Sequence, residues 1–220
     1  MTPSPLLQAV LFDWDGTLLD SYHADLHAYL AMFREMGVRW GPRKLDRHYT
    51  PDWYQVYRAA GIPEARWDEA DACWRGHYAR HRSELMPGAR RVLNTLRRRY
   101  SLGLVTSGDR NRVLRQLRSF RLLATFPIRI CGDDVEDRKP HPFPLQLAMR
   151  KMKMPPDACV YVGDTAEDLQ MARAAGVRSI SIRGPFPTAK KLAAEKPEFY
   201  LDSIRELPPL LRSLYGLRRK

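Results

Sequence analysis

The sequence predicts an α/β fold in which a parallel sheet carries helices on both faces. Short apolar runs alternate along the chain with longer amphipathic runs of helical periodicity, and most of the apolar runs end in polar residues. Only the stretch from about residue 21 to 85 breaks this alternation, because it holds helical patterns and no clear strand run. Alternating strands and helices are typical of a parallel sheet with helical crossovers.

Five short apolar runs are predicted to be the strands of this sheet. They lie at residues 9–12, 102–105, 128–131, 159–162 and 179–182. Helices are expected between them, over residues 88–99, 110–119, 141–153 and 166–175. The prediction is a Rossmann-like core, and ligands of such sheets bind at the carboxyl ends of the strands.

The stretch that lacks strands is predicted to be a small helical cap, inserted after the first strand. It carries helical patterns at 22–36 and 64–82, with a loop marked by Pro and Gly at 37–42. Met86-Pro87-Gly88 marks the return to the core, since Pro and Gly punctuate elements.

These boundaries divide the chain into two expected domains. The core takes residues 1–20 and 86–220, and the cap takes residues 21–85. The short links at Leu19-Asp20 and Met86-Pro87 are expected to act as hinges. Four cap tryptophans are expected to pack the cap rather than to stack on a base, namely Trp40, Trp53, Trp67 and Trp74.

The composition is that of an ordinary soluble globular protein, with 44% hydrophobic and 28% charged residues. No apolar run approaches the length of a membrane-spanning helix, and the N-terminus does not resemble a signal peptide. The three cysteines are scattered without CxxC spacing, which suggests neither a zinc site nor a disulfide framework. We expect a cytoplasmic protein with reduced thiols.

The chain is strongly basic, with 37 basic and 25 acidic residues and a net charge of +12. Such a balance fits a nucleic-acid partner, an anionic substrate or a solvated surface that keeps the protein soluble. No nucleic-acid motif is visible, so the surface interpretation is favoured. We expect neither nucleic acid nor membrane as a partner, and a monomer or a dimer.

The first candidate for chemistry is the acidic pair Asp13 and Asp15, which follows the first predicted strand and precedes Gly16. Two carboxylates at this spacing suit a nucleophile with a general acid/base, or a metal site. An acidic turn at the end of a strand explains the pair equally well, because Asp and Gly are common in turns.

Two further candidates follow later strands. Thr106, Ser107 and Gly108 offer a hydroxyl and backbone N–H groups near a helix start, as a phosphate site needs. A helix N-cap is the alternative interpretation of these residues. Lys139, which precedes a helix, can neutralise a phosphate and nearby carboxylates, although loop lysines are mostly exposed.

The last candidate is Asp164, at the end of a strand, with Asp168 four residues later in the first turn of a helix. Together they offer two oxygen ligands on one side, as magnesium prefers. Acidic residues are also favoured at any helix start by the helix dipole, so this pair alone does not establish a metal site.

Taken together, these segments resemble the haloacid dehalogenase superfamily. The order Asp-x-Asp-Gly-Thr at 13–17, Thr-Ser at 106–107, Lys-Pro at 139–140 and Gly-Asp-Thr-x-x-Asp at 163–168 is that of the superfamily. The resemblance covers about residues 8–185. It implies a phosphatase whose small helical cap covers the site and selects the substrate, a small phosphorylated metabolite.

The resemblance also implies roles in catalysis. Asp13 would be the nucleophile that forms an aspartyl-phosphate, and Asp15 would protonate the leaving group and later activate water. Thr106 would bind a phosphate oxygen, and Ser107 and Gly108 belong to the same substrate site. Lys139 would orient Asp13 and offset negative charge at the phosphate.

A Mg²⁺ cofactor is implied by the same resemblance. Asp13 and the backbone carbonyl of Asp15 would bind the metal together with Asp164. Asp168 would bind the metal or its waters.

Residues at individual positions distinguish the branches of the superfamily. Asp15 favours an enzyme that acts on phosphate esters over a dehalogenase or a phosphonate-cleaving enzyme. The closest resemblance is to phosphoglycolate-phosphatase-like hydrolases. The β-phosphoglucomutase branch has a His where this chain has Asp25, which disfavours a phosphotransferase but leaves it open. A non-catalytic basic binding module on the same fold is the other alternative.

Two residues depart from the pattern of the phosphoglycolate-phosphatase-like hydrolases. Arg138 stands where Gly is usual and Phe143 stands where Asp is usual, so the resemblance does not identify the substrate.

Overall fold

The computed structural model describes residues 6–216 of the 220, and it has the predicted α/β architecture. The described residues contain a six-stranded sheet in the order β5-β4-β1-β6-β7-β8, and all of its neighbouring strands pair in parallel. The strands are β1 (Ala9–Phe12), β4 (Ser101–Val105), β5 (Ile128–Ile130), β6 (Cys159–Gly163), β7 (Arg178–Ile182) and β8 (Tyr200–Leu201).

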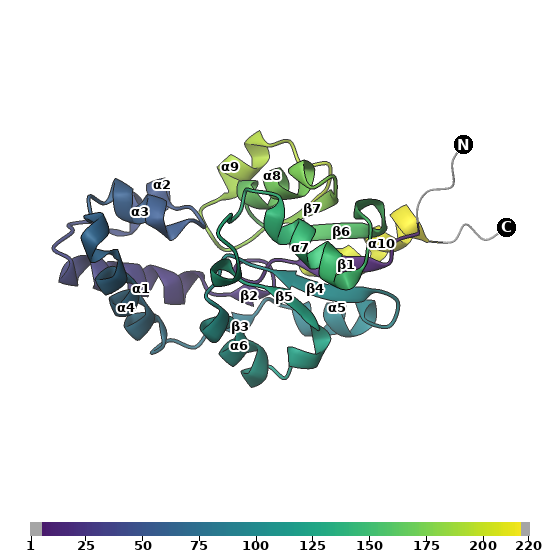
Figure 1. Cartoon of the computed structure of the whole chain (residues 1–220), viewed down its shortest axis with the longest axis horizontal. Coiled ribbons are helices and arrows are strands. Elements are labelled where there is room, and N and C mark those ends of the chain that lie inside the picture. Colours follow the sequence, from purple (N-terminus) through teal and green to yellow (C-terminus); the bar gives the residue numbers. More distant parts are fainter. Residues whose placement is uncertain (1–5, 217–220) are drawn as a thin grey trace.

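Helices cover both faces of this sheet (Figure 1). They are α5 (Ala89–Leu96), α6 (Arg110–Ser119), α7 (Phe143–Met152), α8 (Ala166–Ala174), α9 (Ala189–Ala194) and α10 (Leu207–Tyr215). Val10 and Phe12 of β1 join the hydrophobic cluster that α5, α6 and α10 cover. Ala9 and Leu11 join the cluster under α7 and α8, because side chains alternate along a strand. The central strand is therefore apolar throughout.

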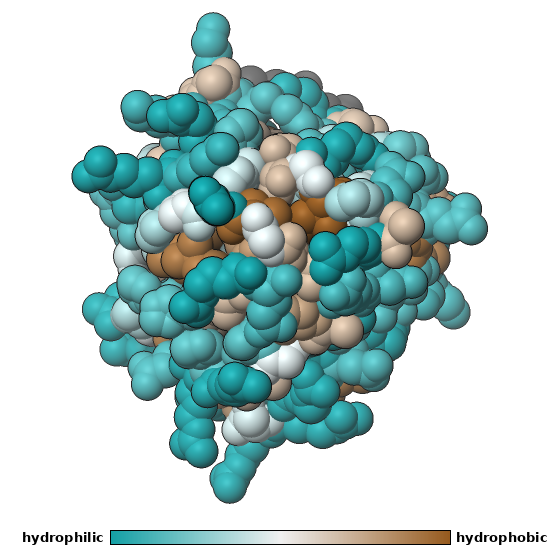
Figure 2. Space-filling view, turned by 90° about the vertical axis from the view of Figure 1, so that its left-hand side faces the viewer, coloured by the Kyte–Doolittle hydropathy of each residue, from teal (hydrophilic) through white to brown (hydrophobic). Residues whose placement is uncertain are grey.

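Four helices lie apart from the sheet, beyond the carboxyl ends of its strands (Figure 1). They are α1 (Tyr22–Glu35), α2 (Pro42–His48), α3 (Trp53–Ala59) and α4 (Trp67–Tyr78). They share their own hydrophobic cluster, in which Tyr29, Phe33 and Tyr57 are fully or almost fully buried. Viewed end-on, this group shows a band of hydrophobic residues between hydrophilic side chains (Figure 2). We refer to α1–α4 and their loops as the cap.

The sequence analysis located α1 and α4 but missed α2 and α3, which are seven residues each. Such short helices carry too few turns to show a clear periodicity. It also missed β8 and a small antiparallel pair, β2 (Leu19–Asp20) with β3 (Glu84–Leu85). This pair joins the expected hinge at Leu19-Asp20 to the residues directly before the other one, at Met86-Pro87. The division into residues 1–20 with 86–220 and 21–85 stays a prediction, and residues 1–5 and 217–220 lie outside the described part.

The cap touches the core at several points besides these links. The Thr50 hydroxyl donates to Glu167 Oε1 at 3.1 Å, and Lys191 Nζ donates to the Tyr49 carbonyl at 2.8 Å. The Arg138 guanidinium lies 4.3 Å from the centroid of the Trp53 ring. The cap is thus seated on the strand ends in this structure. Within residues 6–216, no helix has the length and apolar character that crossing a membrane requires.

Candidate active site

The predicted site residues meet at the carboxyl edge of the sheet. Asp13 and Asp15 follow β1, Thr106 follows β4, and Asp164 follows β6. These three strands are neighbours and run in parallel, so their ends lie side by side. Lys139 comes from the loop before α7 and reaches the same point.

Lys139 joins two of the carboxylates. Its ammonium nitrogen donates to Asp13 Oδ1 at 2.6 Å and to Asp168 Oδ1 at 2.7 Å. All three residues are buried. Charged side chains are rarely buried unless they are paired, so this arrangement depends on all three groups being present.

Asp168 is the most fully engaged of the acidic residues. Its Oδ2 accepts hydrogen bonds from the Asp164 amide, the Thr165 amide and the Thr165 hydroxyl. Its Oδ1 accepts from Lys139, and the Tyr161 hydroxyl lies 2.9 Å away. Thr165 caps α8 and Asp168 completes the capping box, so Asp168 does lie in the first turn of a helix, as expected from the sequence. These contacts fit Asp168 as the anchor that holds Lys139.

Asp164 differs from Asp168, because one of its oxygens has no partner. Its Oδ1 accepts from the Thr17 hydroxyl at 2.8 Å, while its Oδ2 is buried without a hydrogen bond. A β-carbon added at Gly16 or Gly184 would collide with this carboxylate, so the two glycines make room for it. Burial, together with Asp13 and Asp168 nearby, raises the pKa of Asp164 well above its usual range.

These groups fit a divalent cation. Ligand oxygens of Asp13, Asp164 and Asp168 lie within 4.8 Å of one another. Three carboxylates face one ammonium, so two negative charges are uncompensated when all of them are ionised. Burial raises the pKa of Asp13 to about 7, although Lys139 acts to lower it. A hard cation that prefers oxygen ligands would satisfy the free Asp164 oxygen and balance this charge.

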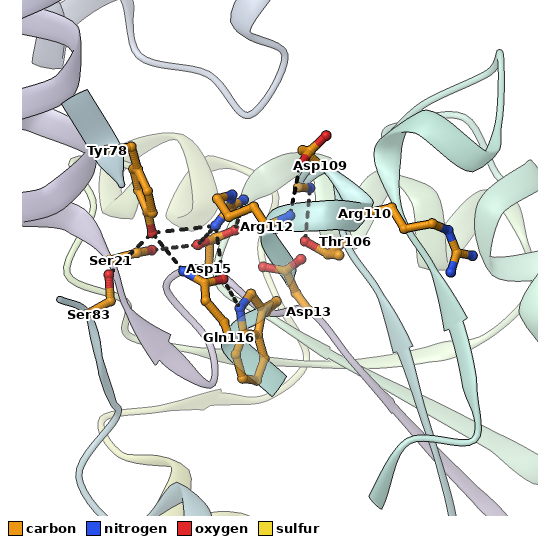
Figure 3. A network of polar contacts seen from close by, with 12 residues as sticks. Asp13, Asp15, Ser21, Tyr78, Ser83, Thr106, Asp109, Arg110, Arg112 and Gln116 are labelled. Carbon is orange, nitrogen blue, oxygen red and sulfur yellow. Dashed lines mark hydrogen bonds and ion pairs between the residues drawn. The ribbon is translucent and has the colours of Figure 1, made fainter. Parts of the chain in front are cut away.

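Asp15 is held separately, by Arg112 of α6 (Figure 3). The guanidinium donates to both carboxylate oxygens, at 2.9 and 2.7 Å, and the Ser21 hydroxyl donates to Oδ1 at 2.7 Å. Although burial acts to raise the pKa of Asp15, Arg112 and Ser21 outweigh it and leave that pKa below its usual value. Gly108 lies against this pair and leaves space for it, because an added β-carbon would meet the guanidinium.

The Arg112 pair is also connected to the cap (Figure 3). Arg112 Nη1 lies 3.4 Å from the Tyr78 hydroxyl at the end of α4, and Gln116 Nε2 donates to the same hydroxyl at 3.2 Å. Gln116 also accepts from the Trp14 indole at 2.9 Å. A change in the seating of the cap would therefore disturb the contacts around Asp15.

Thr106, Ser107 and Gly108 line the same cavity as Asp13 and Lys139. The Thr106 oxygen accepts from the Gly108 amide at 3.1 Å, so its own hydrogen remains available to a ligand. The Gly108 N–H is engaged by this bond. The Thr106 hydroxyl is thus able to donate to a phosphate oxygen, while the Gly108 N–H is not free to do so.

A cavity extends from these residues into the cap. The space open to the centres of water molecules is about 110 Å³. Its cap side is lined by Asp25, Asp71 and several aromatic rings, which include Trp53 and Trp74. These two tryptophans pack in the cap, as expected, and also border the cavity. Four basic residues of the cap are exposed and do not line it, namely Lys44, Arg47, His48 and Arg58.

Comparison with known proteins identifies the fold. The family model described as haloacid dehalogenase-like hydrolase matches residues 10–182. This chain belongs to that family. Among curated proteins, pyrophosphatase PpaX of Bacillus mycoides (strain KBAB4) is 27% identical over 215 residues, which are 96% of this chain and 99% of that protein. The predicted superfamily, fold class and hydrolase assignment are confirmed.

Solved structures of the family superpose closely on this chain. A protein proposed to be a phosphoglycolate phosphatase, from Lactobacillus plantarum, has a TM-score of 0.83 and 26% identity, covering 94% of this chain and 100% of that one. CbbY from Rhodobacter sphaeroides, solved with phosphate, has a TM-score of 0.80 and 25% identity, covering 92% and 96%.

Within this haloacid dehalogenase-like hydrolase, several residues at the site escaped the sequence analysis. Arg112 was one basic residue among 37, and nothing in its neighbourhood marked it as the partner of Asp15. Ser21 and Tyr161 likewise gave no signal. Thr17 was noted only as part of a motif, although its hydroxyl positions Asp164. Asp25 was noted only as the replacement of a His, although it lines the cavity.

Proposed function

We propose that this hydrolase is a magnesium-dependent phosphatase, which cleaves a small phosphate monoester through an aspartyl-phosphate on Asp13. The observation that carries the proposal is the position of Asp13. It is a buried carboxylate at the end of the central strand, with one oxygen fixed by Lys139 and a cavity in front of it.

Asp13 supplies the nucleophile. Its Oδ1 is occupied by Lys139 and its Oδ2 is the oxygen that would attack phosphorus, breaking the bond between phosphorus and the ester oxygen. A carboxylate that approaches a phosphate dianion meets repulsion, and phosphoryl transfer depends mainly on positioning and on charge stabilisation. Lys139 reduces this repulsion, and Thr106 offers its hydroxyl to a phosphate oxygen.

Mg²⁺ would be held by Asp13, Asp164 and the backbone carbonyl of Asp15. The unpartnered Asp164 oxygen supports this set, whereas the hydrogen bonds of Asp168 suit a supporting role through Lys139. The metal would supply positive charge at the phosphate oxygens.

Asp15 would transfer the protons. In the first half of the reaction, its carboxylic acid donates a proton to the departing alcohol oxygen. In the second half, its carboxylate takes a proton from the water that attacks the aspartyl-phosphate, which releases phosphate and restores Asp13. Arg112 and Ser21 favour the ionised form in this structure, so the first step requires Asp15 to leave Arg112 when substrate binds.

The cap and the relatives support a small phosphorylated substrate. The cavity is bordered by α1, α3 and α4, and the exclusion of bulk water by the cap would strengthen the electrostatic effects of Lys139 on Asp13. The names of two relatives, a pyrophosphatase and a proposed phosphoglycolate phosphatase, describe small phosphorylated substrates for those proteins.

The test combines turnover with trapping of the intermediate. We expect hydrolysis of p-nitrophenyl phosphate with Mg²⁺ and none with EDTA. A ³²P-labelled ester should leave acid-stable, hydroxylamine-labile label on the wild type and none on Asp13→Asn. Asp157→Asn, which changes an exposed carboxylate at the other end of β6, is the matched control and should behave as wild type. Normal turnover by a folded Asp13→Asn protein would refute the covalent route. If neither the wild type nor any variant hydrolyses the ester, a non-catalytic binding module would be favoured.

A further inference from the structure

The part of the cavity that faces the cap has an unusual lining for a site that binds anions. It is bordered by aromatic side chains from α1, α3 and α4, among them Tyr29, Trp53, Tyr57 and Trp74. Flat aromatic faces pack well against the C–H groups of a ligand, and their negative quadrupole does not attract an anion.

Two carboxyl groups lie among these rings. Asp25 of α1 is only 8% exposed, and no Lys or Arg forms an ion pair with it among residues 6–216. Asp71 of α4 accepts a hydrogen bond from the Tyr57 hydroxyl at 2.8 Å and lies 3.8 Å from Arg75. Asp71 is therefore paired with Arg75, whereas Asp25 has no ion pair among the described residues.

Two buried indole N–H groups lie beside the cavity. Trp53 Nε1 makes no hydrogen bond in the described structure, while the Trp74 indole faces Asp25 and acts to lower the pKa of that carboxyl. Buried donors without partners are uncommon and mark a place where a ligand atom can accept. The cap side thus offers both acceptors and donors, which matches a hydroxyl group.

The size of the cavity favours a small ligand. The space open to the centres of water molecules is only about 110 Å³, which suits a phosphate group with a short leaving group of a few carbons.

We propose that the leaving group is a short uncharged polyol, and that Asp25 selects against leaving groups that carry a carboxylate or a second phosphate. The proposal rests on the phosphatase function above. Hydroxyl groups would donate to Asp25 and Asp71 and accept from the indoles, while carbon-bound hydrogens pack on the rings. An anionic end group would instead lie against a carboxylate in a water-poor space, where like charges repel strongly. Overall, water cleaves the phosphorus–oxygen bond and yields the polyol and inorganic phosphate.

Matched ester pairs test this proposal directly. Glycerol 3-phosphate and 3-phosphoglycerate share a carbon skeleton and differ in one end group, a hydroxymethyl or a carboxylate. The pair of 2-hydroxyethyl phosphate and 2-phosphoglycolate repeats the comparison with two carbons, and O-phosphoethanolamine adds a cationic end. Assays at pH 8, above the pKa of about 7 that burial gives Asp25, keep this carboxyl ionised.

The expected result is a kcat/KM at least tenfold higher for the neutral member of each pair. Asp25→Asn should reduce this ratio at least fivefold, because it removes the charge and keeps the shape of the side chain. Asp157→Asn, which changes an exposed carboxylate outside the cavity lining, should leave the ratio unchanged. The ratio is independent of how much folded enzyme each preparation contains.

Several outcomes would overturn the proposal. They are equal or better turnover of the carboxylate esters, a tenfold preference for O-phosphoethanolamine, and an Asp25→Asn ratio equal to that of wild type. In each of these cases the enzyme still hydrolyses phosphate esters, so the proposed function stands. If no ester is cleaved, including p-nitrophenyl phosphate, the phosphatase function itself fails.

Discussion

Replacing Asp25 by Asn should change how the stability of this protein depends on pH. Asp25 lies at the cap side of the cavity, and burial raises its pKa from 3.8 to about 7. Asp15 nearby also raises this pKa, while Arg112, Tyr49 and Trp74 oppose the shift. The folded state therefore holds the proton more tightly than the unfolded state, so ionisation of Asp25 works against folding.

The magnitude follows from the two pKa values. The stability conferred by the protonated carboxyl is complete below pH 4 and is lost as the pH rises toward 7. The loss amounts to about 1.6 kcal/mol at pH 5 and about 4.3 kcal/mol at pH 8, at 1.36 kcal/mol per pKa unit. Asn does not titrate, so the advantage of Asp25→Asn over wild type should grow by about 2–3 kcal/mol between these two pH values.

Urea denaturation of both proteins at pH 5, 6, 7 and 8 measures this difference. Constant effects of the Asn side chain on packing cancel when values at two pH are subtracted. The series is run with EDTA and again with Mg²⁺, so that metal binding can be recognised, and Asp68→Asn serves as an exposed control. If the wild-type and Asp25→Asn curves stay parallel to within about 0.5 kcal/mol, against the expected 2–3, the burial argument for Asp25 is wrong.

Three further predictions concern the residues around Asp13. Lys139→Ala should lower kcat by about 10²–10³, the usual effect of losing one well-placed charge stabiliser, and a rate above half of wild type would show that the motif is misassigned. Arg112→Met should lower the free energy of unfolding by about 1–3 kcal/mol, because it leaves a partly buried Asp15 without its ion pair, and an unchanged urea midpoint would contradict this. Gly184→Ala should displace the Asp164 carboxylate, so the rise in melting temperature on adding Mg²⁺ should shrink markedly, whereas a shift equal to wild type would argue against Asp164 as a metal ligand.

The local pattern of the sequence was enough to determine most of the core, although not α9, β8 and α10 at its C-terminal end. The first strand was located to the residue at 9–12, and the helix at 110–119 has the bounds expected for it. Each of these elements is specified by neighbouring residues, through an apolar run or a helical periodicity. The predicted site residues lie together for the same reason, because parallel strands bring their carboxyl ends to one edge.

The partners of the site residues were decided by tertiary structure alone. Arg112 meets Asp15 across 97 residues of sequence, and Lys139 meets Asp13 across 126. Asp168 was predicted to bind the metal or its waters, and nothing in the sequence indicated that its oxygens also accept hydrogen bonds from Lys139, Thr165 and the Asp164 amide. Asp25 acquires its raised pKa from the helices that bury it. Burial and ion pairing depend on which surfaces come together in three dimensions, and a linear pattern does not contain that information.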